Sequence, residues 1–247
     1  MSIKSFPALI SRPMTWLLGL HQQDSFLNIL RSQTFTYPVS REFLTSTSAQ
    51  IVNPRDHRVA TDQVSTTLPA SSVEGLNDEA ILALFTTGFF GGVIFAPERA
   101  ILRMGVWKWL PAHYSTFNSK QPKNIIWRVS DIPKTTLVPI EDVLFGSFKV
   151  IDAKIKSTSD PSPSYVDFGF GSDSASFAGC HRFCVIRNPE ETKDGPSEAD
   201  SGVEIRLEHF RCNPVKNVDS WAEYIPWLHY WYAKLLFADG IRSLLRR

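Results

Sequence analysis

The chain predicts an α+β fold in which a curved antiparallel sheet packs against one long C-terminal helix. Three strand-like runs, at residues 166–170, 177–187 and 203–212, follow one another, and residues 219–247 then read as an aromatic-rich helix. Short connections between consecutive strands favour antiparallel pairing, because parallel neighbours need a crossover. A helix laid across a curved sheet leaves a cavity, and such cavities bind apolar small molecules.

Composition narrows the class of protein. Of 247 residues, 43% are hydrophobic and 21% are charged, which is an ordinary globular balance. A net charge of +1 gives no basic stripe for nucleic acid. The three cysteines show no disulfide spacing, and no apolar run approaches the ~20 residues that cross a bilayer. We therefore expect a cytoplasmic protein without a transmembrane segment or a nucleic-acid partner.

The N-terminal third carries few regular signals. Residues 1–76 are predicted to form an irregular extension, apart from a short helix around residues 16–30. Residues 38–76 are rich in Ser, Thr, Pro and Asn, which favours a long, partly extended connection. The folded domain is then expected to occupy residues 77–247.

Two helices are predicted ahead of the sheet, at residues 77–90 and 96–110. Gly91 and Gly92 end the first helix, and Pro97 suits the first turn of the second. Residues 88–95 between them are very apolar. This joint is either a buried helical hairpin, which we favour, or a contact with a membrane surface or a second subunit.

Residues 124–129 and 143–155 read as further strands, and the second contains Asp152. If Phe148 and Val150 face the core, Asp152 does too, because side chains alternate along a strand. Asp152 is then a candidate base with a pKa raised by burial. If its immediate neighbours face the core instead, Asp152 is solvated. We favour the inward orientation.

The same alternation brings three polar groups to the apolar face of the final hairpin. The odd-numbered positions of residues 177–187 and 203–212 are mostly apolar, and they include His181, His209 and Arg211. A histidine there transfers protons near neutral pH, and an arginine binds a carboxylate, a thioester oxygen or a developing enolate. The structural alternatives are core histidines bonded to backbone carbonyls and a surface ion pair for Arg211.

The sequence favours neither a metal nor a cofactor. Cys180 is next to His181, and His209 lies three residues before Cys212, but alternation directs each pair to opposite faces. The close-paired spacing of a zinc motif is missing. We expect the cysteines to be small buried hydrophobes.

The closing helix supplies candidate ligand contacts. Leu228 and Tyr232 belong to an apolar stripe that begins at Trp221, whereas Trp227 and Trp231 lie off it. This second apolar face predicts either a ligand cavity or a homodimer interface. The candidate substrate-binding residues are Trp127, Phe183, Trp221, Trp227 and Trp231.

The strand at residues 178–185, the strand at 203–212 leading to Asn213-Pro214, and the closing helix together resemble the helix-grip fold of the SRPBCC (START-like) superfamily, over roughly residues 124–247. The segment at residues 89–99 is similar to that of small fungal proteins encoded beside polyketide synthases, of the pyrone-forming cyclase type of aurovertin-like polyene pathways.

The resemblance implies a polyketide cyclase of fungal secondary metabolism. Its substrate would be a linear poly-β-keto polyene acid, or the thioester on a polyketide synthase carrier domain, and its product an α-pyrone. Asp152 or a histidine would act as the base and Arg211 as the oxyanion partner, with no cofactor. The START-like resemblance also implies an alternative, a carrier that binds a lipid or similar molecule without altering it.

Overall fold

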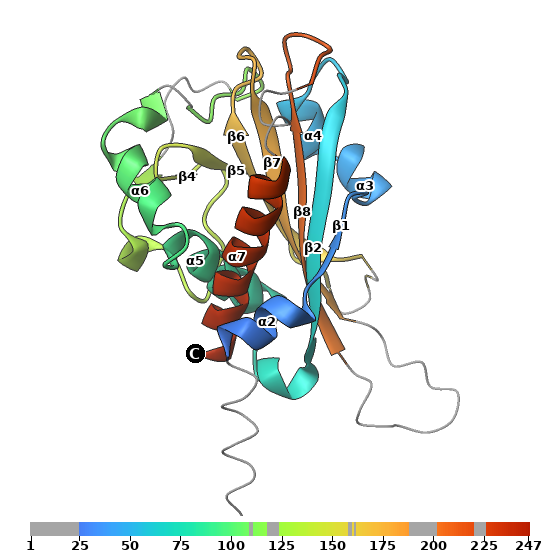
Figure 1. Ribbon diagram of the computed structural model, residues 1–247, viewed down its shortest axis with the longest axis vertical. Coiled ribbons are helices and arrows are strands. Elements are labelled where there is room, and N and C mark those ends of the chain that lie inside the picture. Colours follow the sequence, from blue (N-terminus) through green and yellow to red (C-terminus); the bar gives the residue numbers. More distant parts are fainter. Residues whose placement is uncertain are drawn as a thin grey trace, which may run out of the picture.

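The computed structural model describes residues 25–108, 111–117, 124–157, 160, 162–187, 202–219 and 226–247 (Figure 1). They form an α+β fold with an eight-stranded sheet in the order β1-β2-β8-β7-β6-β5-β4-β3. Neighbouring strands are antiparallel except for β3 and β4. The predicted fold class, a curved and mainly antiparallel sheet followed by a C-terminal helix, is confirmed.

The elements have the following bounds. The strands are β1 (Thr34–Thr36), β2 (Val59–Pro69), β3 (Ile125–Ile126), β4 (Val143–Leu144), β5 (Phe148–Lys154), β6 (Ser164–Gly171), β7 (Ala178–Arg187) and β8 (Gly202–Cys212). The α-helices are α2 (Phe26–Ser32), α3 (Arg41–Leu44), α4 (Thr47–Val52), α5 (Asp78–Gly91), α6 (Ala96–Arg103) and α7 (Pro226–Leu245). Short 3₁₀ turns lie at Ala70–Val73, Val106–Lys108 and Val129–Asp131.

Strand β2 corrects the expectation of an irregular segment through residue 76. It is 11 residues long and pairs with β8 over its whole length, from Val59 opposite Cys212 to Pro69 opposite Gly202. Its buried positions are Asp62, Val64, Thr66 and Leu68, and half of these are polar. Buried and more exposed positions therefore alternate along β2, but half of the buried ones are polar, so the hydrophobic pattern that reveals a strand is weak.

Both faces of the sheet are covered (Figure 1). On one face, α5 and α7 pack on the sheet, with Phe85 in ring contact with Phe183 of β7 and Phe237 of α7. On the other face, α3 and α4 bring Phe43 and Val52 into a second cluster, which includes Cys180, Phe210 and Cys212. All three cysteines are free and buried, as predicted.

The helical joint at residues 88–95 is largely buried, as favoured from the sequence, although Val93 in it is 74% exposed. Asn77 caps α5 by accepting a hydrogen bond from the Ala80 amide at 2.8 Å. Phe89, Phe90 and Phe95 are almost fully buried around the joint. In the described part of the chain no single helix is long and apolar enough to cross a membrane. Helices α5 and α6 together reach that length and apolar character, but they are bent by 71° at the break between them.

Helix α7 turns a different stripe towards the core from the one predicted. Its buried side chains are centred on Ala233, Phe237, Ile241 and Leu244, whereas Leu228 is 51% exposed. These four positions follow helical spacing, and they lie on a different side of the helix from Leu228. Trp221 and the other residues before Pro226 lie outside the described residues.

Candidate functional site

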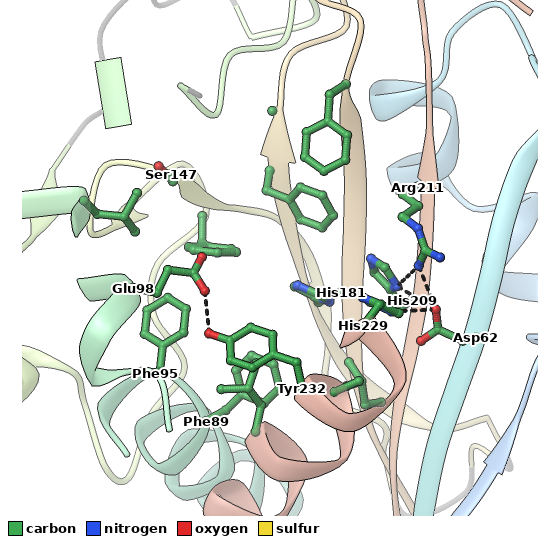
Figure 2. Close-up of a pocket in the computed structure, with 18 residues that line it drawn as sticks. Asp62, Phe89, Phe95, Glu98, Ser147, His181, His209, Arg211, His229 and Tyr232 are labelled. Atoms are coloured by element: carbon green, nitrogen blue, oxygen red, sulfur yellow. Dashed lines mark hydrogen bonds and ion pairs between the residues drawn. The ribbon is translucent and has the colours of Figure 1, made fainter. Parts of the chain in front are cut away.

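A cavity of about 310 Å³ lies between the sheet and helices α5, α6 and α7 (Figure 2). Its walls are mainly apolar and aromatic, with a small number of polar side chains, as is typical of small-molecule sites. The lining residues are Asp62, Phe89, Phe95, Glu98, Leu102, Ser147, Phe148, Phe170, Gly171, Phe177, His181, Leu207, His209, Arg211, His229, Tyr232, Ala233 and Leu236.

Four of these side chains form a polar cluster around one carboxylate oxygen. Oδ2 of Asp62 lies 3.1 Å from Nδ1 of His209, 2.8 Å from Nε2 of His229 and 2.9 Å from Nη1 of Arg211. An ionised carboxylate only accepts hydrogen bonds, so all three groups donate to it. Asp62 and His209 are each 2% exposed and Arg211 is 6% exposed, whereas the His229 side chain is 26% exposed, so water reaches the cluster only on the His229 side.

Strand pairing explains why these groups meet. Asp62 of β2 is directly opposite His209 of β8, and His209 is directly opposite His181 of β7. Arg211 lies two residues after His209 and therefore points to the same face. The predicted meeting of His181, His209 and Arg211 on the apolar face is thus confirmed.

Two members of the cluster were missed from the sequence. Asp62 was not identified because the sequence predicts an irregular segment there, although Asp62 alternates in step with Val64 and Leu68 on the same face of β2. His229 was not identified because the apolar stripe predicted for α7 runs through Leu228 and Tyr232 and leaves His229 off it. His229 lies four residues before Ala233, on the same side of the helix, and only the structure shows that this side is buried.

The three histidine rings form a stack along the cavity wall. The His181 and His209 ring centroids are 4.7 Å apart with planes at 27°, and those of His209 and His229 are 4.8 Å apart at 29°. Phe170 continues the stack at 5.7 Å from His209. This packing limits rotation of the rings, so their nitrogen atoms have defined directions.

Burial controls the charge of the cluster. Burial alone would raise the pKa of Asp62, but His209 and His229 hold it well below its usual range. Burial lowers the pKa of His209 from 6.5 to about 4, although Asp62 opposes this shift. Burial, reinforced by His209 and His229, also lowers the pKa of His181 well below its usual value. At neutral pH the site therefore holds an anionic Asp62 beside neutral His181 and His209.

Two polar atoms on this wall of the cavity are buried and have no partner among the described residues. Among the described residues, nothing hydrogen-bonds to Oδ1 of Asp62 or to Nδ1 of His181. A buried polar atom without a partner costs about 1–3 kcal/mol. A bound molecule with donor or acceptor groups would remove that cost.

A second polar pair lines the cavity away from Asp62 (Figure 2). The Tyr232 hydroxyl of α7 donates to Oε2 of Glu98 of α6 at 2.6 Å. Burial raises the pKa of Glu98, and the hydrogen bond from Tyr232 partly offsets this rise. The pair joins α6 to α7 across the cavity.

The inward orientation favoured for Asp152 is wrong. The β5–β6 register shifts between Val150 and Asp152, which is a β-bulge that places an extra residue in β5. Val150 belongs to the cluster under α5 and α7, but Asp152 accepts a hydrogen bond from the Tyr165 hydroxyl at 2.9 Å. The Arg182 guanidinium lies 3.9 Å from the centroid of the Tyr165 ring, on the face of the sheet that α3 and α4 cover. Asp152 therefore lies outside the cavity.

The aromatic residues predicted to bind substrate are also placed elsewhere. Phe183 is fully buried in the core beneath the cavity, and Trp127 packs at the edge of that core. Trp227 is 67% exposed and Trp231 is 53% exposed, so neither lines the cavity. Trp221 lies outside the described residues. Phenylalanines of α5 and of strands β5 and β6 line the cavity instead.

Asp62, His209 and His229 also offer a possible metal-ligand set, because their ligand atoms all lie within 4.8 Å of one another. Two imidazoles and one carboxylate suit a divalent transition metal. Here, however, the Arg211 guanidinium already supplies a positive charge to the same carboxylate oxygen. A cation at this position would be repelled by Arg211, so the arrangement favours proton transfer and anion stabilisation.

Comparison with known proteins leaves the site to be interpreted from its geometry. No family model matches the chain, and searches of curated proteins and of solved structures return no match.

Proposed function

We propose that the protein is a polyketide cyclase that closes an α-pyrone from a linear poly-β-keto chain within a helix-grip fold of the SRPBCC type. The observation that carries the proposal is an aromatic cavity with a buried carboxylate, imidazole and guanidinium cluster on one wall. An apolar cavity holds a flexible polyene, and the cluster supplies the groups that lactonisation needs.

The reaction is an intramolecular acyl transfer. A base removes the proton of the enol on the δ-carbon, and the enol oxygen attacks the terminal carbonyl carbon. The resulting tetrahedral oxyanion collapses with cleavage of the bond to the thiol, which leaves with the proton that the base accepted. With a free acid, water leaves instead of the thiol.

His209 is the group best placed to act as the base. Its Nδ1–H donates to Asp62, which directs the lone pair of the neutral ring to Nε2, as in carboxylate–imidazole pairs of hydrolases. Asp62 then stabilises the imidazolium that forms. Arg211, which is held by the same carboxylate, is the cation available to the oxyanion.

Much of the rate enhancement would come from positioning. Folding a flexible chain so that its enol oxygen approaches the terminal carbonyl can contribute about 7–11 kcal/mol to lowering a barrier. The phenylalanines of the cavity wall would supply this constraint and exclude water that would otherwise hydrolyse a thioester.

The proposal is tested with 3,5-dioxohexanoyl-N-acetylcysteamine, a short thioester that closes to a pyrone. Wild-type protein should accelerate release of 4-hydroxy-6-methyl-2-pyrone above the uncatalysed rate, and Asp62→Asn should lower that acceleration at least a hundredfold. Asp152→Asn is the matched control, because it removes a carboxylate from the opposite face of the sheet. Equal rates with and without wild-type protein would reject the cyclase proposal for this substrate class.

The second candidate is a carrier, and the lowered pKa of His209, about 4, favours it. A base this weak has less driving force for proton abstraction near neutral pH. A carrier would retain a hydrophobic molecule unchanged. Native mass spectrometry of the purified protein, before and after incubation with the thioester, distinguishes a retained ligand from a released pyrone.

A further inference from the structure

Ser147 is a buried polar residue on the cavity wall that the acid–base cluster does not use. It is 4% exposed, and no group among the described residues hydrogen-bonds to its hydroxyl. Figure 2 shows it on the side of the cavity away from Asp62. A buried hydroxyl in this state is a vacant hydrogen-bonding position facing a space large enough for a ligand.

The turn that presents Ser147 is strained. Phe145 has φ 51° and Gly146 has φ 76°, and the Ser147 amide donates to the Leu144 carbonyl at 3.1 Å. Two successive residues with positive φ are typical of a type I′ turn, but a phenylalanine is unfavourable there. Phe145 is fully buried, and its packing against Phe95 holds the turn in place. The position of the Ser147 hydroxyl is therefore set by the fold.

The neighbouring polar groups leave this position open to an uncharged ligand group. The Tyr232 proton is committed to Glu98, so that pair is already satisfied. Arg211 is the one cationic side chain among the described lining residues, and it is bound to Asp62 at the other side. A carboxylate near Ser147 would find no cationic partner on that side among the described lining residues, and it would lie on the same side as Glu98.

We propose that Ser147 binds an uncharged oxygen of the ligand, a hydroxyl or a carbonyl, at the side of the cavity away from Asp62. The ligand is then an apolar molecule with an oxygen function towards each end. This inference rests on the part of the proposed function that makes the cavity a ligand site. It does not require that the ligand be transformed.

The test uses 1,8-octanediol, an apolar chain with a hydroxyl at each end, and isothermal titration calorimetry. Ser147→Ala should raise the Kd about fivefold, which corresponds to one hydrogen bond of about 1 kcal/mol. The matched control is Thr86→Val. Thr86 is 2% exposed and also has a hydroxyl without a partner among the described residues, but it does not line the cavity. Its replacement should leave the Kd unchanged.

Thermal unfolding without ligand provides the control for folding. Ser147→Ala should have the same Tm as wild type or a higher one, because it removes an unsatisfied hydroxyl. The proposal is overturned if Ser147→Ala binds the diol as well as wild type, if Thr86→Val weakens binding equally, or if wild type does not bind it. Failure to form a pyrone while the diol binds as expected would count against the cyclase alone.

Discussion

At the scale of single residues, Asp62 organises the site. Three donors converge on its Oδ2, and together they hold a carboxylate ionised at a position 2% exposed to water. Removing the negative charge leaves the Arg211 guanidinium buried without its counter-ion, which is costly. Asp62→Asn should therefore lower both turnover and stability. His181 and His209 affect stability in a different way, through their own protonation.

The lowered histidine pKa values predict a pH dependence of stability. In the unfolded chain these rings titrate near 6.5, whereas folded His209 titrates at about 4. Between these values the unfolded state binds more protons, so the free energy of unfolding falls as the pH drops from about 6.5 towards 4. His209 contributes about 3 kcal/mol to this fall, and His181 adds to it in the same direction.

Urea unfolding measured at intervals between pH 7 and pH 4 checks this expectation. His209→Gln should show a shallower decline than wild type, because it lacks one of the two rings whose pKa is lowered. A decline of equal steepness in both proteins would contradict the assignment of a lowered pKa to His209.

At the scale of elements, a buried ion pair ties α4 to the outer face of the sheet. Arg182 of β7 donates two hydrogen bonds to Asp167 of β6, at 2.8 and 2.7 Å. Ser48 of α4 donates to the same carboxylate at 2.5 Å. The Arg182 guanidinium also lies 4.6 Å from the ring of Phe43 in α3. The short helices before β2 are therefore held by polar contacts as well as by apolar packing.

Breaking this pair should destabilise the protein strongly. Arg182→Met leaves the fully buried Asp167 unpaired, and we expect a loss of about 3–5 kcal/mol in the free energy of unfolding. The double variant Arg182→Met/Asp167→Leu should recover most of this loss, because it removes both charges.

The exposed pair between Arg58 and Asp219 is the control, and Arg58→Ala should change stability by less than about 1 kcal/mol. Chemical denaturation of all three variants measures these differences. A double variant as unstable as Arg182→Met would show that the charge left unpaired is not the cause.

At the scale of the whole molecule, the segment before residue 77 is part of the sheet. Strand β2 lies between β1 and β8, and it carries Asp62 into the cavity. Without it, β8 would expose a full edge of unpaired backbone groups, and α3 and α4 would no longer cover the outer face.

A chain that begins at residue 77 should consequently fail to fold cooperatively. Its near-ultraviolet circular dichroism should lack the signal of packed aromatic rings, and its thermal transition should be broad or absent. A sharp transition similar to that of the full chain would show that residues 77–247 are an independent domain.

The sequence by itself determined the α+β class, the antiparallel hairpin of β7 and β8, and the face that His181, His209 and Arg211 share. These follow from local periodicity, because alternation along a strand and short connections require no distant partner. The burial of the free cysteines followed from the same reasoning.

The tertiary structure alone decided the carboxylate and the boundaries of the site. Asp62 reaches His209 through pairing across 147 residues of chain, and no local pattern reports such a contact. A single bulge in β5 turned Asp152 to the opposite face, because one extra residue reverses the alternation. Packing against the sheet and α5 likewise determines which stripe of α7 is buried, since a helix that is apolar on several sides can pack in more than one orientation.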